Sequence, residues 1–357
     1  MAIEVTQKPS NGSCIIDCVT NCKRGTSEGL VVNLHPDFPI PEDQLHADMA
    51  FPWLEQVHEL SEIQQTLLPN LPAFNTIGEY KEFVSQLRSI SELWIILKRA
   101  WSLNRSGKLD LSNAELAKYR PKDSGEKHNL SEALFDFCGQ LLGPIRRKIF
   151  TDAAELLAEA NRNHPSKFAD FKRHHKAAIY PLSLDHYFEV FSEYFKDFGE
   201  FTQTLLMCQY NMPMQQNAIA SSTAFSITRM TYGNQFEALT SQFVVLACIN
   251  NILSNREFGT FQSMDLKKYL TTNKANRANP FLNLPAFAEF SKSIDSTLRN
   301  ASHHGAIKLD QSGITIRFRS GGSGAEQKMR YSEYLSICNE NILRLAALFM
   351  LELILAL

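Results

Sequence analysis

The chain has 357 residues, of which 44% are hydrophobic and 21% are charged. This length permits two or three domains with a sizeable core, and the composition is that of an ordinary globular protein. The formal net charge of −2 excludes a polycation that coats nucleic acid along its whole length. Any contact with nucleic acid must therefore come from a local basic patch.

The cysteines and the apolar segments favour a cytoplasmic protein with reduced thiols. The N-terminus lacks a basic start followed by an apolar run, so we expect no signal peptide. The count of seven cysteines is odd, which argues against a disulfide framework. The longest apolar run, 343–357, includes Arg344 and Glu352 and is shorter than the ~20 residues that span a bilayer. We expect a buried helix there and no membrane partner.

Three cysteines near the N-terminus are the main candidates for a metal site. Cys14, Cys18 and Cys22 have the spacing C-x3-C-x3-C, and His35 is an imaginable fourth ligand. Structural zinc sites usually contain two cysteine or histidine pairs, and iron–sulfur proteins use other spacings. We therefore expect no metal and no cofactor.

In chain order, the first fifty residues predict short strands in SCIIDCV and GLVVNL, separated by the turn-rich NCKRGTSEG. From Phe51 onward the hydrophobic spacing is mostly helical. Polar residues 104–130 predict a long loop or linker, and a break is expected near Tyr180-Pro181. This break suggests a mostly helical N-terminal domain with a short β segment, 1–180, and a C-terminal domain, 181–357. The expected N-terminal helices cover 52–68, 77–103 and 130–161.

The C-terminal domain is predicted to be a helical bundle. Ser183 is a plausible N-cap for its first helix, whose aromatic stripe indicates a core or dimer face. AIKL and ITIRFR predict a β-hairpin, SGGSGAE predicts a flexible loop, and a long final helix begins near Tyr331. The expected fold is mainly α, a bundle with a β-hairpin inserted before the last helix. The other expected helices cover 184–208, 233–254 and 285–302.

The segment LRNASHHGAI, 298–307, places unusual chemistry at the end of a predicted helix. Arg299 has a planar fork of donors that matches phosphate oxygens. His303 and His304 have the side chain whose free pKa is nearest neutrality, so they can exchange a proton at working pH. Asn300 and Ser302 add uncharged hydrogen-bonding groups, and Gly305 suits the end of a helix.

Within this segment, Arg299, Asn300 and His304 fit the R-N-x-x-x-H form of the R-x(4–6)-H motif. The bare motif is weak, but here it ends a helix late in a bundle, with a glycine, a short hairpin and a final helix after it. The C-terminal part, 181–357, thus resembles the HEPN ribonucleases of bacterial defence and toxin systems. The resemblance does not extend to 1–180. His303, at i+4 from Arg299, lies on the same helical face and is a second candidate for the catalytic histidine.

The resemblance implies a metal-independent endoribonuclease with a composite site at a homodimer interface. The RNA 2′-hydroxyl would attack its own 3′-phosphate, with His304 moving protons and Arg299 stabilising the phosphorane. It also implies a role in antiphage defence or as a toxin, with an antitoxin or a phage-derived trigger as a possible partner. Two alternatives stay open: a non-catalytic HEPN-like scaffold that dimerises or binds nucleotide or RNA, and a regulatory helical protein unrelated to HEPN proteins.

Basic residues around the motif are candidates for binding substrate. Ser302 of the motif is a further candidate for binding substrate. The basic candidates, Lys308, Arg317 and Arg319, lie on the predicted hairpin, and the two arginines lie on one face of an extended strand. They could contact the RNA backbone, although an ordinary solvated hairpin has the same pattern. A second basic region, at 146–148 and 171–176, is better explained as a solvated helix face.

Overall fold

The computed structural model describes most of the chain from residue 89 onward and short segments before it. The described residues are 2–7, 14–20, 39–44, 89–119, 129–214, 216–222, 224–319 and 324–357. The predicted helix 52–68, the strand in GLVVNL and the first part of the predicted helix 77–103 lie outside these residues.

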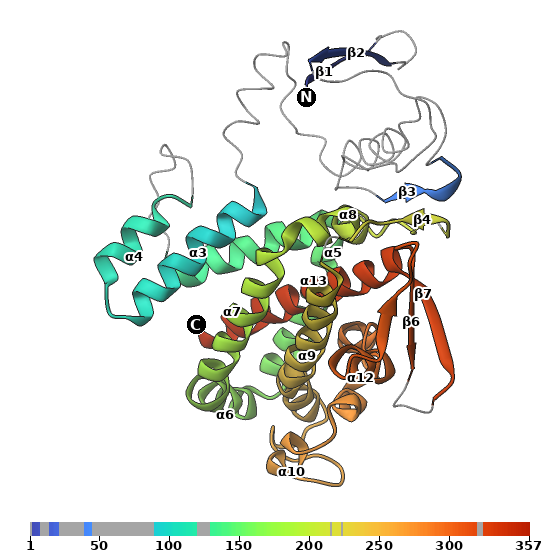
Figure 1. Cartoon of the computed structure of the whole chain (residues 1–357). Helices are drawn as coiled ribbons and strands as arrows, with labels where there is room; N and C mark the ends of the chain where they lie inside the picture. Colours follow the sequence, from blue (N-terminus) through green and yellow to red (C-terminus); the bar gives the residue numbers. More distant parts are fainter. Residues whose placement is uncertain are drawn as a thin grey trace.

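Two small antiparallel pairs involve the N-terminal segments. β1 (Ala2–Gln7) pairs with β2 (Cys14–Thr20), which confirms the strand in SCIIDCV. β3 (Ile40–Pro41), followed by the 3-10 turn Glu42–Gln44, pairs with β4 (Ala218–Ile219). The β3–β4 pair thus joins residues before the helices to the middle of the chain (Figure 1).

The rest of the described chain is mainly helical, as predicted, and its helices pack around a long C-terminal helix (Figure 1). The longer helices, in chain order, are α3 (Ile90–Arg105), α4 (Leu109–Leu116), α5 (Leu130–Asn163), α6 (Pro165–His174), α7 (Tyr180–Lys196), α8 (Phe198–Gln209), α9 (Phe225–Leu253), α12 (Ser296–His303) and α13 (Tyr331–Ala356). The short ones are α10 (Leu266–Leu270), the 3-10 turns Lys274–Asn276 and Asn279–Phe281, α11 (Pro285–Ala288) and the 3-10 turn Glu289–Ser291.

The predicted loop 104–130 is wrong over its first half, because α4 forms there. Because α4 contains many polar residues, its packing cannot be recognised from a hydrophobic pattern in the sequence. The Ser112 hydroxyl donates to the Ala100 carbonyl of α3 at 2.8 Å, and Leu116 is buried in the core. Contacts with α3 therefore stabilise a helix that local composition does not predict.

The predicted break near Tyr180-Pro181 is a π-helical turn, His175–Ile179, between α6 and α7. Pro181 has no N–H, and its ring would collide with the carbonyl of Ala177 in an unbroken α-helix. A wider turn, closed by the Tyr180 N–H on the His175 carbonyl, lets the chain stay helical. Ser183 is therefore not an N-cap; it lies inside α7, and its hydroxyl donates to Gln242 at 2.7 Å.

Two other predicted helices are interrupted. The predicted helix 184–208 is divided at Asp197 into α7 and α8, although its aromatic stripe is buried as expected. The predicted helix 285–302 is α11, a 3-10 turn and then α12, which starts afresh because Asp295 caps it. α9 begins at Phe225, eight residues before the predicted start at 233.

A three-stranded antiparallel sheet precedes α13. It consists of β5 (Ile307–Leu309), β6 (Thr315–Arg319) and β7 (Glu326–Arg330), in the order β5-β6-β7. The first two strands confirm the predicted hairpin, whereas β7 was not predicted: it occupies the residues between the predicted flexible loop and the last helix and shares only Glu326 with that loop. Ile316 and Phe318 of β6 are buried, whereas Arg317 between them is exposed, so one face of the sheet packs on the helices.

Buried side chains from α3 through α13 form one hydrophobic core that extends from Leu93 to Leu355. α5 and α7 both contact α13, so helices on each side of the proposed boundary at 180/181 share this core. α9 is the one described helix long and apolar enough to cross a membrane, with a mean hydropathy of 1.4. Because 83% of its apolar window is buried by other helices, α9 is compatible with a soluble protein.

The core contains a carboxylate on α13. Glu352 is fully buried; its Oε1 accepts from the Tyr187 hydroxyl at 2.7 Å, and its Oε2 lies 3.0 Å from His175 Nε2. Burial and the nearby Glu352 carboxylate hold the pKa of Tyr187 well above its ordinary value, so the phenol remains a donor. The three groups tie the π-helical turn and α7 to α13.

We expect Glu352→Ala to lower the free energy of unfolding by about 3–5 kcal/mol, because it leaves His175 and Tyr187 buried without their partner. Glu333→Ala is the matched control, since Glu333 is exposed in the first turn of the same helix. It should cost less than about 1 kcal/mol. Urea denaturation of both variants measures the difference, and equal losses would contradict a stabilising role for the Glu352 network.

Candidate functional site

The motif lies on α12, a short helix with well-formed ends. Asp295 caps its start, and its Oδ1 accepts from the N–H of Thr297 at 2.7 Å and of Leu298 at 3.0 Å. Gly305 follows the last turn with φ +70°, and the Ala306 N–H returns to the Ala301 carbonyl at 2.9 Å. This confirms the prediction that Gly305 ends the helix, because a left-handed residue is needed there.

The guanidinium of Arg299 is held on three sides. Its Nε donates to Glu237 Oε1 of α9 at 2.6 Å, and its Nη2 forms an ion pair with the same carboxylate. Its Nη1 donates to Asn300 Oδ1 at 2.8 Å, and the group lies 5.9 Å from the centre of the Phe236 ring. The side chain is still 31% exposed, so Arg299 is oriented and partly accessible.

Glu237 is shared between two cations. Its Oε2 forms an ion pair with Lys274, which also donates to the Glu237 backbone carbonyl at 3.3 Å. Burial acts to raise the pKa of Glu237, but the hydrogen bonds and charges of Lys274 and Arg299 outweigh it and hold the pKa below its ordinary value. Glu237 is therefore ionised at neutral pH and offsets part of the charge of Arg299.

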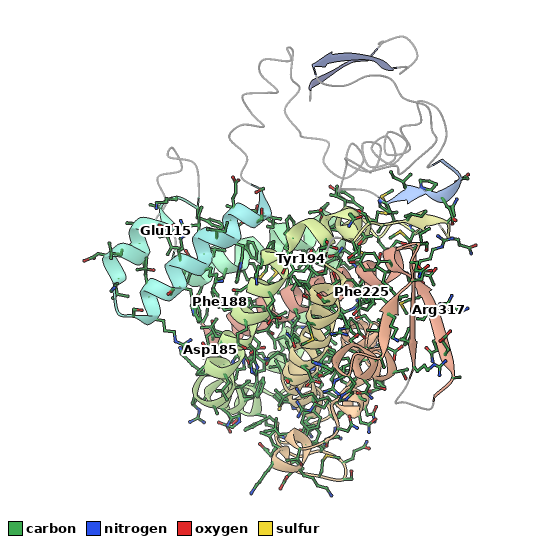
Figure 2. All side chains as sticks on the ribbon, viewed as in Figure 1. Glu115, Asp185, Phe188, Tyr194, Phe225 and Arg317 are labelled. Atoms are coloured by element: carbon green, nitrogen blue, oxygen red, sulfur yellow. The ribbon has the colours of Figure 1, made fainter. Side chains whose placement is uncertain are left out.

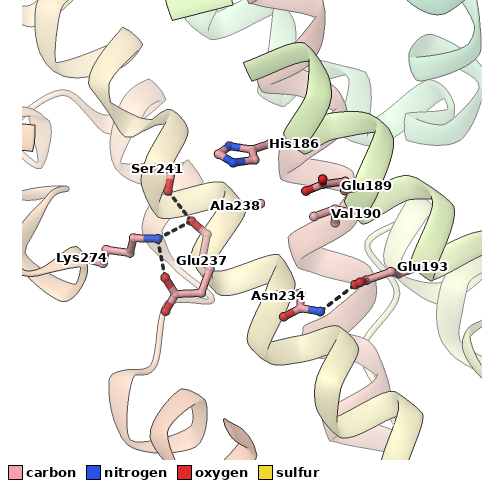
Figure 3. A pocket seen from close by; sticks show the side chains of 9 residues that line it. All are labelled: His186, Glu189, Val190, Glu193, Asn234, Glu237, Ala238, Ser241 and Lys274. Carbon is pink, nitrogen blue, oxygen red and sulfur yellow. Dashed lines mark hydrogen bonds and ion pairs between the residues drawn. The ribbon is translucent and has the colours of Figure 1, made fainter. Parts of the chain in front are cut away.

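Glu237 also lines a groove of about 270 Å³ between α7 and α9 (Figure 3). Glu189 and Glu193 project from the α7 side, and Glu193 accepts from the Asn234 amide at 2.8 Å. Ser241 and Lys274 lie on the opposite side. Most charges of the groove are negative, so it repels phosphate and is a poor continuation of an anion site.

The two histidines of the motif differ in their surroundings. His303 lies against α9: a Cβ built on Gly233 would be 2.6 Å from its Nε2, which is buried and has no hydrogen-bond partner among the described residues. His304 is exposed, and its backbone N–H closes the helix on the Asn300 carbonyl at 3.0 Å. Of the two, His304 is free to meet a substrate.

Ser302, expected to bind substrate, is fully buried. Its hydroxyl donates to the Leu298 carbonyl at 2.8 Å and lies 3.1 Å from the Tyr334 hydroxyl of α13. The expectation that Ser302 binds substrate is therefore wrong, because its hydroxyl faces the core and links α12 to α13. The sequence could not reveal this, since the partner is thirty-two residues away.

One face of α9 lies against three residues of the segment around the motif, Arg299, His303 and Gly305. Glu237 binds Arg299, Gly233 touches His303, and Arg229 places Nη1 3.3 Å from where a Cβ of Gly305 would lie. These α9 residues are spaced by four, so they share a helical face. None of these three residues was predicted from the sequence. The i, i+4 spacing of 229, 233 and 237 was the available signal, but the predicted helix began only at 233.

The basic candidates of the hairpin gather on the outer face of the sheet. Lys308, Arg317 and Lys328 are directly opposite one another across β5, β6 and β7, and Arg317 projects from the outer side of the sheet (Figure 2). Arg319 lies two residues further on, 3.2 Å from Glu326, which is also 3.6 Å from Arg317. Like charges directly opposite on a sheet destabilise it, and Glu326 offsets this repulsion only at Arg317 and Arg319, so the row keeps an excess of positive charge.

No group of three or more histidine, cysteine or acidic side chains that could hold a metal occurs in the part of the chain that the structure describes. The side chains of Cys14, Cys18, Cys22 and His35 lie outside that part, so the N-terminal metal candidate stays untested. The buried cysteines Cys138, Cys208, Cys248 and Cys338 are free thiols.

The lowered pKa of Glu237 predicts an acid-sensitive contact. A carboxylate whose folded-state pKa lies below its unfolded value stabilises the fold above the unfolded pKa, near 4.3, and loses this contribution as pH falls through the folded pKa. We expect Glu237→Gln to lower Tm by a few degrees at pH 7 and to match the wild type more closely as pH falls towards 3. Thermal denaturation between these pH values measures the difference.

The control for this prediction removes Lys274, one of the two cations that lower the pKa of Glu237. In a Lys274→Gln background, one of the two charges that lower the Glu237 pKa is missing, so the pH-dependent effect of Glu237→Gln should shrink. An effect that is the same at every pH, or unchanged without Lys274, would contradict the shared ion pair.

Comparison with known proteins assigns neither the fold nor the site. No family model matches the chain, and no curated protein or solved structure matches it. The resemblance to HEPN proteins therefore stays a prediction from the motif and its surroundings in this chain.

Proposed function

We propose that the protein is a metal-independent endoribonuclease with a HEPN-type site built from Arg299 and His304. The observation that carries this proposal is their placement: a held but partly exposed guanidinium lies on one short capped helix, and an exposed imidazole directly follows the last turn of that helix. Asn300 is a positioning residue, because its side-chain oxygen accepts from Arg299.

The proposed reaction transfers a phosphoryl group within RNA. A general base removes the proton from the 2′-hydroxyl, whose oxygen attacks the adjacent phosphorus. The bond from phosphorus to the 5′-oxygen breaks, and a general acid protonates the leaving oxygen. The products are a 2′,3′-cyclic phosphate and a 5′-hydroxyl. Arg299 stabilises the additional negative charge of the phosphorane, and DNA is not cut because it has no 2′-hydroxyl.

The reaction needs both a general base and a general acid, but one copy of the motif has only one exposed histidine. His303 is turned against Gly233, whereas His304 faces solvent. A homodimer in which two α12 ends face each other supplies two His304 side chains, one for each role. This requirement supports the proposal of a composite site between two copies of the chain.

Arg299 shares Glu237 with Lys274, so an incoming phosphate competes with a carboxylate. This contact supports a restrained enzyme that needs a trigger or the release of an antitoxin. A cytoplasmic role in antiphage defence or as a toxin agrees with such restraint, because unregulated cutting of cellular RNA is lethal.

The same contact favours a second candidate function. Every nitrogen of the Arg299 guanidinium has an acceptor within the protein. A non-catalytic HEPN-like scaffold that dimerises or binds nucleotide or RNA requires only an oriented arginine and no proton transfer. Cleavage of RNA separates the two functions.

The cleavage test compares purified wild type with Arg299→Ala and His304→Ala on total RNA in EDTA, with and without lysate from phage-infected cells. We expect metal-independent cutting with cyclic-phosphate ends, and a loss of about 10²–10⁴-fold for His304→Ala, which is typical of a general acid or base. His303→Ala should retain more activity than His304→Ala.

Matched controls are Arg99→Ala on α3 and His164→Ala after α5, which remove the same residue types outside the motif. Both should cut like the wild type. Equal cutting by the motif variants and the controls would rule out the proposed site, and RNA binding without cutting under both conditions would favour the scaffold.

The basic row on the sheet predicts a salt-dependent contact with the RNA backbone. Changing Lys308, Arg317 and Lys328 together to Gln should lower the slope of log affinity against log salt by about 2, since each phosphate contact of a single strand contributes about 0.7. The control, Lys98→Gln/Arg99→Gln/Lys108→Gln, removes the same charge from α3 and the turn after it. Fluorescence anisotropy at several salt concentrations measures both slopes; equal slopes would assign the row to ordinary solvation.

A further inference from the structure

Arg229 on α9 is a cation that the proposed reaction has not used. Its Nη1 lies 3.3 Å from the position that a Cβ of Gly305 would occupy, so its guanidinium rests against the backbone directly after His304. Its side chain is partly buried. Arg229, on α9, therefore lies beside the exposed end of α12. Arg299 belongs to α12 itself and lies about one turn before that end.

The charge of Arg229 is unbalanced. Its Nε is buried without a hydrogen-bond partner, and no carboxylate of the described chain forms an ion pair with it. Arg299, by contrast, is bound by Glu237. A buried donor without a partner carries a free-energy cost, and an unseen anion or water is a common reason for such a donor.

Part of the stabilisation of the Arg229 charge needs no ligand, because a cation at the C-terminal end of a helix interacts favourably with the helix dipole. That interaction requires only positive charge near the carbonyls. It supplies no acceptor for the Nη groups of Arg229, which donate to no described residue. A phosphate supplies such acceptors, since its oxygens accept from the donors of a guanidinium.

We propose that Arg229 binds a phosphate of the RNA substrate beside His304. This inference deepens the proposed function and rests on it for the identity of the anion. Arg229 thus anchors the backbone at one end of α12, and Arg299 acts on the phosphorane once the phosphate has displaced part of its contact with Glu237. Gly305 leaves room for this arrangement, because a Cβ there would lie 3.3 Å from the guanidinium.

The test uses a fluorescent 2′-O-methyl RNA oligonucleotide, which the protein cannot cut because the attacking hydroxyl is blocked. Arg229→Gln should weaken its binding about tenfold and lower the salt slope by about 0.7, the contribution of one phosphate contact on a single strand. Arg229→Lys should keep most of the slope but bind more weakly than the wild type, because it retains charge without the fork. Arg99→Gln, which removes an arginine from α3, should bind like the wild type.

Tm measured for each variant separates binding from folding. If Arg229→Gln is unfolded, Arg229→Lys decides: weaker binding at an unchanged Tm supports the proposal, and binding equal to the wild type overturns it. A folded Arg229→Gln that binds like Arg99→Gln also overturns it, as does a wild type that does not bind the oligonucleotide.

Cleavage of unmodified RNA distinguishes this failure from failure of the proposed function. Cutting that is independent of Arg229 overturns the anchor and leaves the nuclease. Binding that depends on Arg229 without any cutting supports the anchor, with the protein acting as a scaffold.

Discussion

The site depends on how closely α9 and α12 approach each other at Gly233. A single Cβ at that position would lie 2.6 Å from His303 Nε2, a distance at which the His303 side chain or one of the two helices must shift. Glycine inside a helix costs roughly 0.5–1 kcal/mol relative to alanine, so its presence in the middle of α9 requires a compensating contact. The close approach of the helices provides it, and brings Glu237 to Arg299 and Arg229 to Gly305.

Charge around α12 is distributed unevenly. Glu237 serves both Arg299 and Lys274, and the groove beside it, between α7 and α9, is mostly acidic. The sheet that follows α12 carries basic side chains on its exposed face. A polyanion is therefore attracted to the sheet side of α12 and repelled from the groove side, which sets a direction for any nucleic acid that reaches the motif.

Sequence patterns predicted the features that depend on neighbouring residues. The end of α12 at Gly305, the hairpin, the start of α13 at Tyr331 and the buried aromatic stripe of α7 all follow from local spacing and turn chemistry. The mainly helical fold class follows from the same signals.

Features that depend on distant contacts could not be predicted in this way. α4 forms in a polar segment because α3 packs on it, and Ser302 faces the core because Tyr334 lies there. In the sequence, Glu237 looks like an ordinary polar residue of a helix, and only the structure shows that Arg299 of α12 binds it. The motif itself was visible, but its electrostatic environment was not, since hydrophobic periodicity carries no information about which charges meet across helices.

The π-helical turn, His175–Ile179, has a consequence for how the chain tolerates change. Such a turn contains one residue more than an α-helical turn, and each residue rotates a helix by about 100°. Loss of one residue here would leave the sequences of α6 and α7 intact but change their rotational phase, so His175 and Tyr187 could not both face Glu352. A substitution in α6 or α7 changes a single contact. A change in the length of the π-helical turn, by contrast, changes the alignment of all the contacts that these two helices make.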